Sequence, residues 1–406
     1  RHDLGGVSAA DFLRSGLYHH LQKEMTMEPF VTFDLSVQRT GANIRVSPSL
    51  PHVGMIVVFP DSTSPNIPEV IYSKGELLDL LLLRPDPNDP TQVVRAIFPN
   101  DDISLKSAYY LAGVVPLRIV PVIMPPTAIE GIAQAAERMG RCNMADLLCD
   151  GGASTYTTWH NAFKNLIVSH GIMEQDATSD KKIQFVAINM GASHSPSVGP
   201  GTYPVSTHPN TIVFAGYFGY DGLGYPAMLP ATVQYISLLA NQFNNLDYFA
   251  PTFNKVLFPL STPLDRIYTT GERNALNNNR INCFKPIENG WVFNDNITLD
   301  SATVFSEENI RRLAVHVRND LITILKQFLG YQNTKKTRDE VILAIRSYWQ
   351  RNIEIHRYRP TEVKIVCDES NNVDYDNRLY VSLDVKMPRS VKYIHLLTVA
   401  MNLNPA

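Results

Sequence analysis

The sequence predicts an α/β protein with a mixed sheet, followed by a C-terminal unit of two helices and then strands. Strand-like and helix-like segments alternate over residues 123–300, which is typical of a sheet with crossover helices. Beyond residue 300, two amphipathic helices follow each other directly and the strand-like segments come after them. We therefore expect a helix and a strand in residues 1–40, an α/β middle domain at 41–299 and a C-terminal α+β domain at 300–406.

The first part of the chain contains short elements separated by turn residues. Within residues 1–40, a capping sequence at Ser8–Asp11 opens an apolar helical stripe, and Val31–Val37 alternates like a half-buried strand. Residues 41–122 have the order strand, helix, loop, helix, strand, and the loop at 84–90 is rich in proline. The bounds predicted here are a strand at Val53–Phe59, a helix at Lys74–Leu83 and a strand at Leu117–Val122.

The middle of the chain continues this alternation. Residues 191–209 are dominated by Gly, Ser and Pro, which predicts an exposed loop. The elements expected before that loop are helices at Thr127–Met139 and Thr157–Ser169, and strands at Met144–Cys149 and Lys182–Asn189.

The C-terminal part has the clearest helical signals. Apolar residues recur on one face over 310–328, with Ser306 as the expected N-cap and Gly330 as the left-handed residue that ends the helix. The second helix is expected to open with a capping box at Thr337–Glu340. The strands predicted after it are Glu362–Cys367, Arg378–Lys386 and Val391–Met401.

Composition excludes several classes of function. The formal net charge is −3, and the chain has no basic stripe of the kind that binds nucleic acid. No apolar run reaches the ~18 residues of a membrane-spanning helix. Charged residues make up only 18% of the chain, below the usual ~25%. Extensive contacts between subunits would explain this low charge content, and so would a large monomeric core.

Possible catalytic and metal-binding motifs fail on their spacing. Gly191–Ser195 places a serine beside a histidine but lacks the G-x-S-x-G pattern of a nucleophile elbow, and the glycines within 219–224 lack the dinucleotide-binding spacing. One further group contains metal-ligating side chains: Cys142, Cys149, Asp150 and His160. Its spacing matches no compact zinc pattern. We predict no catalytic residue, cofactor or metal site, and the alternative is an α/β enzyme with an unrecognised active site.

A series of short motifs runs in one order through the C-terminal part. It comprises Glu272, Leu276-Asn277, Ile281-Asn282, Gly290, Thr298-Leu299, Arg311-Arg312-Leu313, Tyr348-Trp349, Val366-Cys367-Asp368 and, separated by Pro388, the strands Leu379–Met387 and Val391–Val399. In order and residue type, these motifs resemble the C-terminal domain of contractile tail sheath proteins from myovirus-type phages and related injection machines.

Similarities to the same family also lie further forward. The matching segments are Val53–Phe59, Ser64–Pro68, Lys74–Leu83 and Leu117–Val122, with fainter matches at Ala215-Gly216 and Tyr225–Ala227. Ser64 stands where the family has a glycine, and the family's middle-domain tryptophan and Ala-Pro-Ala-Asn sequence are absent. The resemblance covers about residues 44–401 and is carried mainly by the part after residue 265.

The resemblance implies a structural protein and not an enzyme. Such a subunit polymerises helically around a tail tube and contracts to drive the tube through the host envelope, which leads to ejection of the viral genome. The implied partners are other copies of the chain, the tail tube protein, and the baseplate and tail terminator proteins, without nucleic-acid binding or membrane insertion. The implied location is the virion tail, after assembly in the host cytoplasm, with the C-terminal domain facing the tube.

Four basic residues gain an expected role from the resemblance: Lys335, Lys336, Arg338 and Arg346. On the domain that faces inward, they would form a basic edge in contact with the tube. Charges at the rim of an interface mainly set the register and the association rate of the partners. A solvated loop would explain the same cluster without any partner.

The last predicted strand, Val391–Met401, is apolar on both faces and should need covering partners. In the family, arms of neighbouring subunits complete a shared sheet, which is β-augmentation between copies. The residues expected at this interface are Val391, Tyr393, Ile394, Leu397 and Val399. Without such arms the strand edge would stay open, so we expect residues 1–406 alone to be a monomer or a weak associate.

Overall fold

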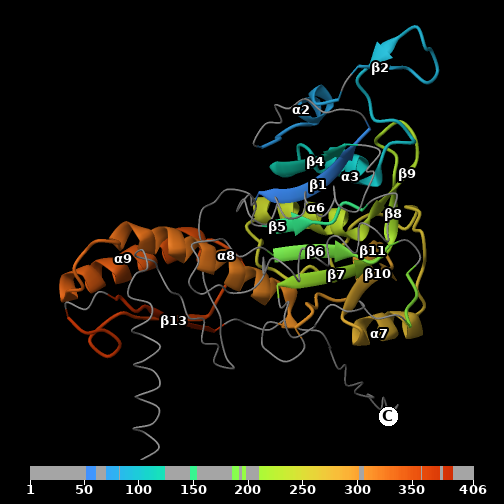
Figure 1. Ribbon diagram of the computed structural model, residues 1–406. Helices are drawn as coiled ribbons and strands as arrows, with labels where there is room; N and C mark the ends of the chain where they lie inside the picture. Colours follow the sequence, from blue (N-terminus) through green and yellow to red (C-terminus); the bar gives the residue numbers. More distant parts are fainter. Residues whose placement is uncertain are drawn as a thin grey trace, which may run out of the picture.

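The computed structural model describes residues 52–60, 70–81, 83–123, 147–152, 185–191, 194–197, 210–300, 306–357, 359–374 and 378–386. They form a body built on a large sheet, from which an arm of two long helices extends to one side (Figure 1). The predictions for residues 1–40, the turn at 64–68, the helices at 127–139 and 157–169, and the strand at 391–401 fall outside the described residues.

Within the described ranges, seven strands form the main sheet in the order β11-β10-β7-β6-β5-β1-β4. All neighbours are parallel except β10 and β11, so the mixed sheet that the sequence predicts is confirmed. Strands β1, β5, β6 and β7 are buried along their whole length, which explains their continuous apolar sequences. The bounds are β1 Val53–Phe59, β4 Leu117–Ile123, β5 Leu147–Cys149, β6 Phe185–Asn189, β7 Thr211–Ala215, β10 Ile281–Ile287 and β11 Gly290–Phe293.

Helices α3 and α6 pack against each other and against the sheet. Helix α3 contacts β1, whereas α6 contacts β5, β6 and β7. Helix α7 packs on β10, and α2 is shorter than the predicted 74–83. The bounds are α2 Lys74–Asp79, α3 Ile103–Leu111, α6 Ala231–Asn244 and α7 Thr270–Asn278.

Two small antiparallel hairpins accompany the main sheet. The first, β2–β3, projects from the body (Figure 1), and Arg84 at its base binds the Asp101 carboxylate through contacts of 2.8 and 2.9 Å. The second, β8–β9, leads directly into α6. The bounds are β2 Arg84–Pro85, β3 Val93–Val94, β8 Tyr217–Tyr220 and β9 Ala227–Pro230.

The arm consists of a helical hairpin and a two-stranded sheet. Gly330 has the positive φ of +87° expected after the first helix, and the chain then reverses direction. The arm returns to the body where the Arg357 backbone N–H donates to the Leu246 carbonyl at 2.9 Å. The bounds are α8 Glu308–Leu325, the 3₁₀ turn η3 Lys326–Phe328, α9 Lys335–Asn352, β12 Glu362–Val366 and β13 Ser382–Lys386. The division of the chain near residue 300 stays a prediction.

Residues of the sequence motifs stabilise the part of the body around β10 and α7. The buried Asn282 amide donates to the carbonyls of Val213 at 3.0 Å and Ile297 at 2.9 Å, so it links β7, β10 and the following loop. Glu272 and Thr269 form a reciprocal capping box at the start of α7. These polar side chains therefore have structural roles that motif order alone does not reveal.

The predicted starts of the two arm helices are wrong. Ser306 does not cap α8, because its carbonyl pairs with the Thr298 N–H at 2.9 Å, and Glu307 takes the N-cap position. Helix α9 starts earlier than predicted, with Thr334 as N-cap accepting from the Thr337 N–H at 3.4 Å. Because Thr334 and Thr337 are both good capping residues, spacing alone does not distinguish them.

Gly290 opens β11 at a point where a larger residue would not fit. Its φ is +154°, and an added Cβ would lie 2.5 Å from the Phe258 carbonyl oxygen, which accepts from Trp291 N–H at 2.9 Å. We predict that Gly290→Ala lowers the free energy of unfolding by about 1–3 kcal/mol in a denaturant titration. The control is Gly271→Ala, whose Cβ would meet no atom within 4 Å. Equal losses in both variants would contradict the steric explanation.

Candidate assembly surface

The exposed face of α9 carries three of the four predicted basic residues. Lys335 lies 3.1 Å from Asp339, and Lys336 lies 3.8 Å from Glu340, each pair one turn apart and largely exposed. Arg346 is exposed about three turns further along the same helix. Exposed pairs of this kind contribute little to folding stability, so their charges are accessible to a partner at small structural cost.

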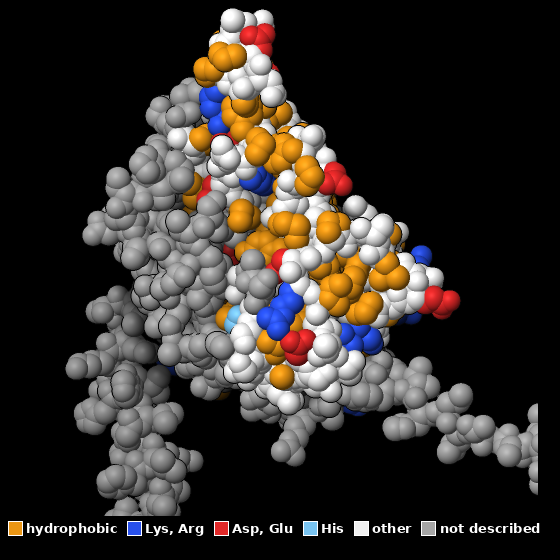
Figure 2. Space-filling model, turned by 90° about the vertical axis from the view of Figure 1, so that its right-hand side faces the viewer, with side chains coloured by type: hydrophobic (Ala, Val, Ile, Leu, Met, Phe, Trp, Pro, Cys, Tyr) orange, Lys and Arg blue, Asp and Glu red, His pale blue; other side chains and the backbone are white. Residues whose placement is uncertain are grey.

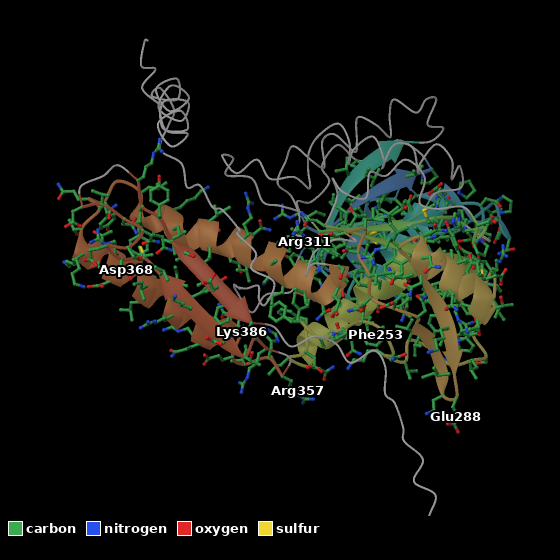
Figure 3. The ribbon with its side chains drawn as sticks, turned by 90° about the horizontal axis from the view of Figure 1, so that it is seen from below. Phe253, Glu288, Arg311, Arg357, Asp368 and Lys386 are labelled. Carbon is green, nitrogen blue, oxygen red and sulfur yellow. The ribbon has the colours of Figure 1, made fainter. Side chains whose placement is uncertain are left out.

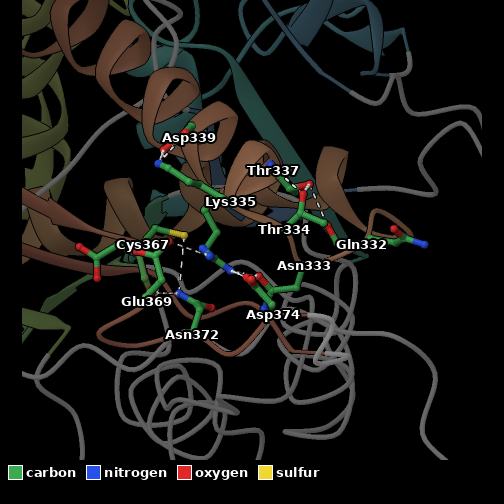
Figure 4. Close-up of polar contacts among 12 residues, drawn as sticks. Gln332, Asn333, Thr334, Lys335, Thr337, Asp339, Cys367, Glu369, Asn372 and Asp374 are labelled. Carbon is green, nitrogen blue, oxygen red and sulfur yellow. Dashed lines mark hydrogen bonds and ion pairs between the residues drawn. The ribbon is translucent and has the colours of Figure 1, made fainter.

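The fourth predicted residue, Arg338, does not lie on this surface. Its side chain is only 1% exposed, so the prediction of an exposed basic residue is wrong at this position. The guanidinium donates to Asp374 at 2.7 Å, Asn333 at 3.0 Å and Glu369 at 3.2 Å (Figure 4). The hydrogen bond to Asp374, together with that to Glu369, raises the pKa of Arg338 although burial opposes this.

Leu343 adds an apolar group to the exposed face of α9. Its side chain is 67% exposed, and helical spacing places it beside Glu340 and Arg346. An apolar group surrounded by charged ones resembles the centre and rim of a protein interface. Sequence reasoning missed Leu343 because, for this surface, it considered the basic residues of the helix and not the apolar ones between them. An isolated leucine on a polar helix face is the signal that could have identified it.

The two-stranded sheet offers strand edges for pairing. Val363 on β12 faces Val385 on β13, and both pack towards the core of the arm. On the outer face, Lys386 forms an ion pair with Glu362 across the strands. Within the described part of the arm, each strand is paired on one side only. The other side presents backbone N–H and C=O groups that a further strand could bind.

A buried ion pair anchors the arm to the body. Glu308 and Arg312, one turn apart in α8, are 0% and 1% exposed and form a direct hydrogen bond. Glu308 also accepts from the Tyr235 hydroxyl of α6 at 2.6 Å, and Arg312 donates to the Tyr248 carbonyl. Burial disfavours the Arg312 charge, but the Glu308 carboxylate outweighs burial and raises the pKa of Arg312. Through Tyr235, the ion pair links α8 to α6.

The hairpin of α8 and α9 with its sheet extends well beyond this anchor. Seen from below, Asp368 lies at the far end of the arm, whereas Arg357 lies near the body and Glu288 marks the tip of the β10–β11 hairpin (Figure 3). The arm thus presents the α9 face and the β12–β13 edges at a distance from the main sheet.

The main sheet has a position where other parallel α/β sheets bind ligands, and among the described residues helix α3 packs there. Parallel α/β sheets bind ligands where the strand order reverses, which in this protein is between β1 and β5. The Ser104 hydroxyl accepts from the Val58 N–H at 2.9 Å, and the Ser107 hydroxyl donates to the Gly151 carbonyl at 2.6 Å. A Cβ on Gly151 would lie 2.5 Å from Met55 Cε. Helix α3 therefore packs directly onto the strand ends.

The other side chains considered for chemistry are structural where the structure describes them. Cys149 and Cys283 are fully buried, and burial raises the pKa of Cys283 to about 12. Cys142 and His160 lie outside the described residues. Among the residues that the structure describes, there is no group of three or more His, Cys, Asp or Glu arranged to hold a metal ion.

A helix long and apolar enough to cross a membrane is also absent from that part of the chain.

Apolar side chains are exposed on the face that carries the β2–β3 hairpin (Figure 2). The exposed apolar residues of the hairpin region and of the segment between α6 and α7 are Leu83, Val93, Leu246, Val256, Leu260 and Ile267. Large exposed apolar areas are typical of surfaces that another protein covers.

Comparison with solved structures identifies the fold. A chain in the structure of the anti-feeding prophage baseplate aligns with a TM-score of 0.64 and 15% identity, covering 93% of this chain and 99% of that chain. The contracted helical sheath of the anti-feeding prophage aligns with a TM-score of 0.63 and 14% identity, covering 92% and 99%. The contracted sheath complex of an extracellular contractile injection system, PVC, aligns with a TM-score of 0.61 and 13% identity, covering 93% and 98%.

No family model and no curated protein sequence matches the chain. The structural similarity nevertheless covers nearly the whole length of both partners in each comparison. The chain therefore has the fold of contractile sheath proteins, as the resemblance in its motifs predicted.

Proposed function

We propose that this protein is a structural subunit of a contractile sheath and has no catalytic role. The main observation in support of this proposal is the structural similarity to the contracted helical sheath of the anti-feeding prophage, which covers 92% of this chain. The ordered motifs of the C-terminal part point to the same family independently of the fold. The exposed apolar side chains and the charged fraction of only 18% are suited to a subunit covered by its neighbours.

In this proposal the chain polymerises helically around a tail tube, with residues 300–406 facing the tube and 41–299 facing outward. Its partners are other copies of itself, the tube protein, and the baseplate and tail terminator proteins. In a phage it would be part of the virion tail, assembled in the host cytoplasm, and contraction would drive the tube through the host envelope for genome ejection. The driving energy would come from the interfaces of a bistable assembly and not from a nucleotide.

Subunits would be joined by strand addition at the arm. The edges of β12 and β13 that pair with no other strand among the described residues provide the acceptor, and main-chain hydrogen bonds would supply the affinity. The residues proposed for the added or adjacent strand remain Val391, Tyr393, Ile394, Leu397 and Val399.

Negative-stain electron microscopy of the full-length gene product, produced alone and together with the tube protein, tests this proposal. Tubes or contracted cylinders are expected in at least the second sample. A protein that stays monomeric at high concentration in both samples would contradict the proposed function.

The exposed charges of α9 give a second prediction. Reversing them in the triple variant Lys335→Glu, Lys336→Glu, Arg346→Glu should weaken the coating of tubes, because rim charges set register and association rate. The melting temperature should stay close to that of the unmodified protein, since exposed pairs contribute about 0–1 kcal/mol. Pelleting with tubes measures coating, and Arg95→Glu, an exposed ion-paired arginine of the body, is the matched control. Normal coating by the triple variant would show that this face is only solvated.

A further inference from the structure

Among the residues that the structure describes, the β12–β13 sheet consists of these two strands alone, which is too small to hold its own position. Each strand has five residues, and an isolated two-stranded hairpin is marginally stable at best. Its inner face packs on the arm, where Val385 is 4% exposed, but its outer face carries charged side chains. The end of the sheet that carries the connecting loop therefore needs a further attachment to the helices.

Arg338 supplies that attachment. The guanidinium extends from α9 and binds three side chains on two other segments. Asn333 lies in the turn between α8 and α9, whereas Glu369 and Asp374 lie in the loop that connects β12 to β13. The two carboxylate side chains are 66% and 57% exposed, but Arg338 is 1% exposed. The loop thus covers the guanidinium and is fixed to α9 by it.

The same loop is attached on its returning side. The Asn333 amide donates to the Arg378 carbonyl at 2.6 Å, just before β13. Within the loop, Asn372 donates to the Tyr380 carbonyl at 2.8 Å and accepts from the Tyr380 N–H at 2.7 Å. Arg338 and Asn333 therefore hold the loop near both strands. We name Arg338, Asn333, Glu369 and Asp374 the clasp.

We propose that Arg338 is a positioning residue for strand addition, because the clasp fixes the β12–β13 edge relative to α8 and α9. This inference rests on the proposed function, in which that edge accepts a strand from a neighbouring copy of the chain. A preorganised edge binds its strand more tightly, because less freedom is lost on pairing. Without the clasp the two strands would open more often, and their edge would move relative to the helical arm.

The chemistry of arginine suits this role better than that of lysine. A planar guanidinium presents several N–H donors in fixed directions, so it can bind two carboxylates and an amide oxygen at once. A lysine ammonium is a compact point charge and would not reproduce this geometry. Arg338→Lys should therefore keep the charge and lose part of the positioning, whereas Arg338→Gln should lose both.

Hydrogen exchange of the full-length gene product tests the clasp directly. In Arg338→Gln, the amides of β12 and β13 should exchange about tenfold faster or more, while those of β6 and β7 keep their protection. Arg351→Gln, which removes an exposed cation of the same helix, is the matched control and should change neither. Pelleting and electron microscopy should show fewer polymers for Arg338→Gln, with Arg338→Lys intermediate.

The outcomes separate the inference from the proposed function. Unchanged exchange in β12 and β13, or faster exchange with polymers as abundant as before, would overturn the positioning role. An unmodified protein that never polymerises would contradict the proposed function, and the exchange result would still decide whether the clasp holds the edge. If Arg338→Gln also speeds exchange in β6 and β7, that variant has lost global stability, and Asp374→Asn and Glu369→Gln are tested in its place. Faster exchange in β6 and β7 of these milder variants as well would overturn the inference.

Discussion

Replacing Arg312 with methionine is expected to lower the free energy of unfolding by about 3–5 kcal/mol, because it leaves the buried Glu308 carboxylate without its cation. Both side chains are at most 1% exposed, so water cannot take over the lost interaction. The Tyr248 carbonyl would also lose its hydrogen bond from the guanidinium. A urea titration followed by circular dichroism measures the change.

Two controls separate this buried pair from ion pairs in general. Arg95→Ala breaks the ion pair with Asp79, whose atoms lie 2.7 Å apart and whose side chains are 45% and 70% exposed. This variant should lower the free energy of unfolding by only about 0–1 kcal/mol. The double variant Glu308→Leu, Arg312→Met removes both charges and should recover part of the loss. Equal losses for Arg312→Met and Arg95→Ala would show that burial does not determine the strength of the pair.

The sequence predicted correctly those elements whose apolar side chains are mostly buried in the fold. The bounds of β1 are those predicted, because an uninterrupted apolar run between polar residues has one favourable location, the interior of a parallel sheet. The helices of the arm were also found in the predicted order, because their apolar periodicity extends over several turns. Their starts were predicted wrongly, since backbone pairing of Ser306 with Thr298 depends on tertiary contacts.

The same limit applies to the candidate surface. Arg338 was interpreted as exposed because charged residues near a turn usually are, and its carboxylate partners lie 31 and 36 residues further along the chain. The spacing of Glu308 and Arg312 suggests an ion pair, but only the fold places Tyr235 and Tyr248 around it. Local patterns therefore predict which elements form, whereas the depth of a charged side chain depends on distant segments.

Phe214→Ala is the second substitution with a large expected effect, about 3–5 kcal/mol of lost unfolding free energy, because it leaves a cavity at the centre of the main sheet. Phe214 is 0% exposed, and its ring centroid lies 5.1 Å from Tyr235 and 4.8 Å from Phe293. The control Tyr72→Ala removes a ring that is 60% exposed and should cost much less.

Phe214 and the buried ion pair share one neighbour, which makes their coupling measurable. Tyr235 packs against Phe214 and also donates its hydroxyl to Glu308 at 2.6 Å. A cavity at Phe214 would let the Tyr235 ring shift and weaken that hydrogen bond. The double variant Phe214→Ala, Arg312→Met should therefore depart from the sum of the single losses by more than about 0.5 kcal/mol. Strict additivity in urea titrations would show that the core of the sheet and the anchor of the arm are energetically independent.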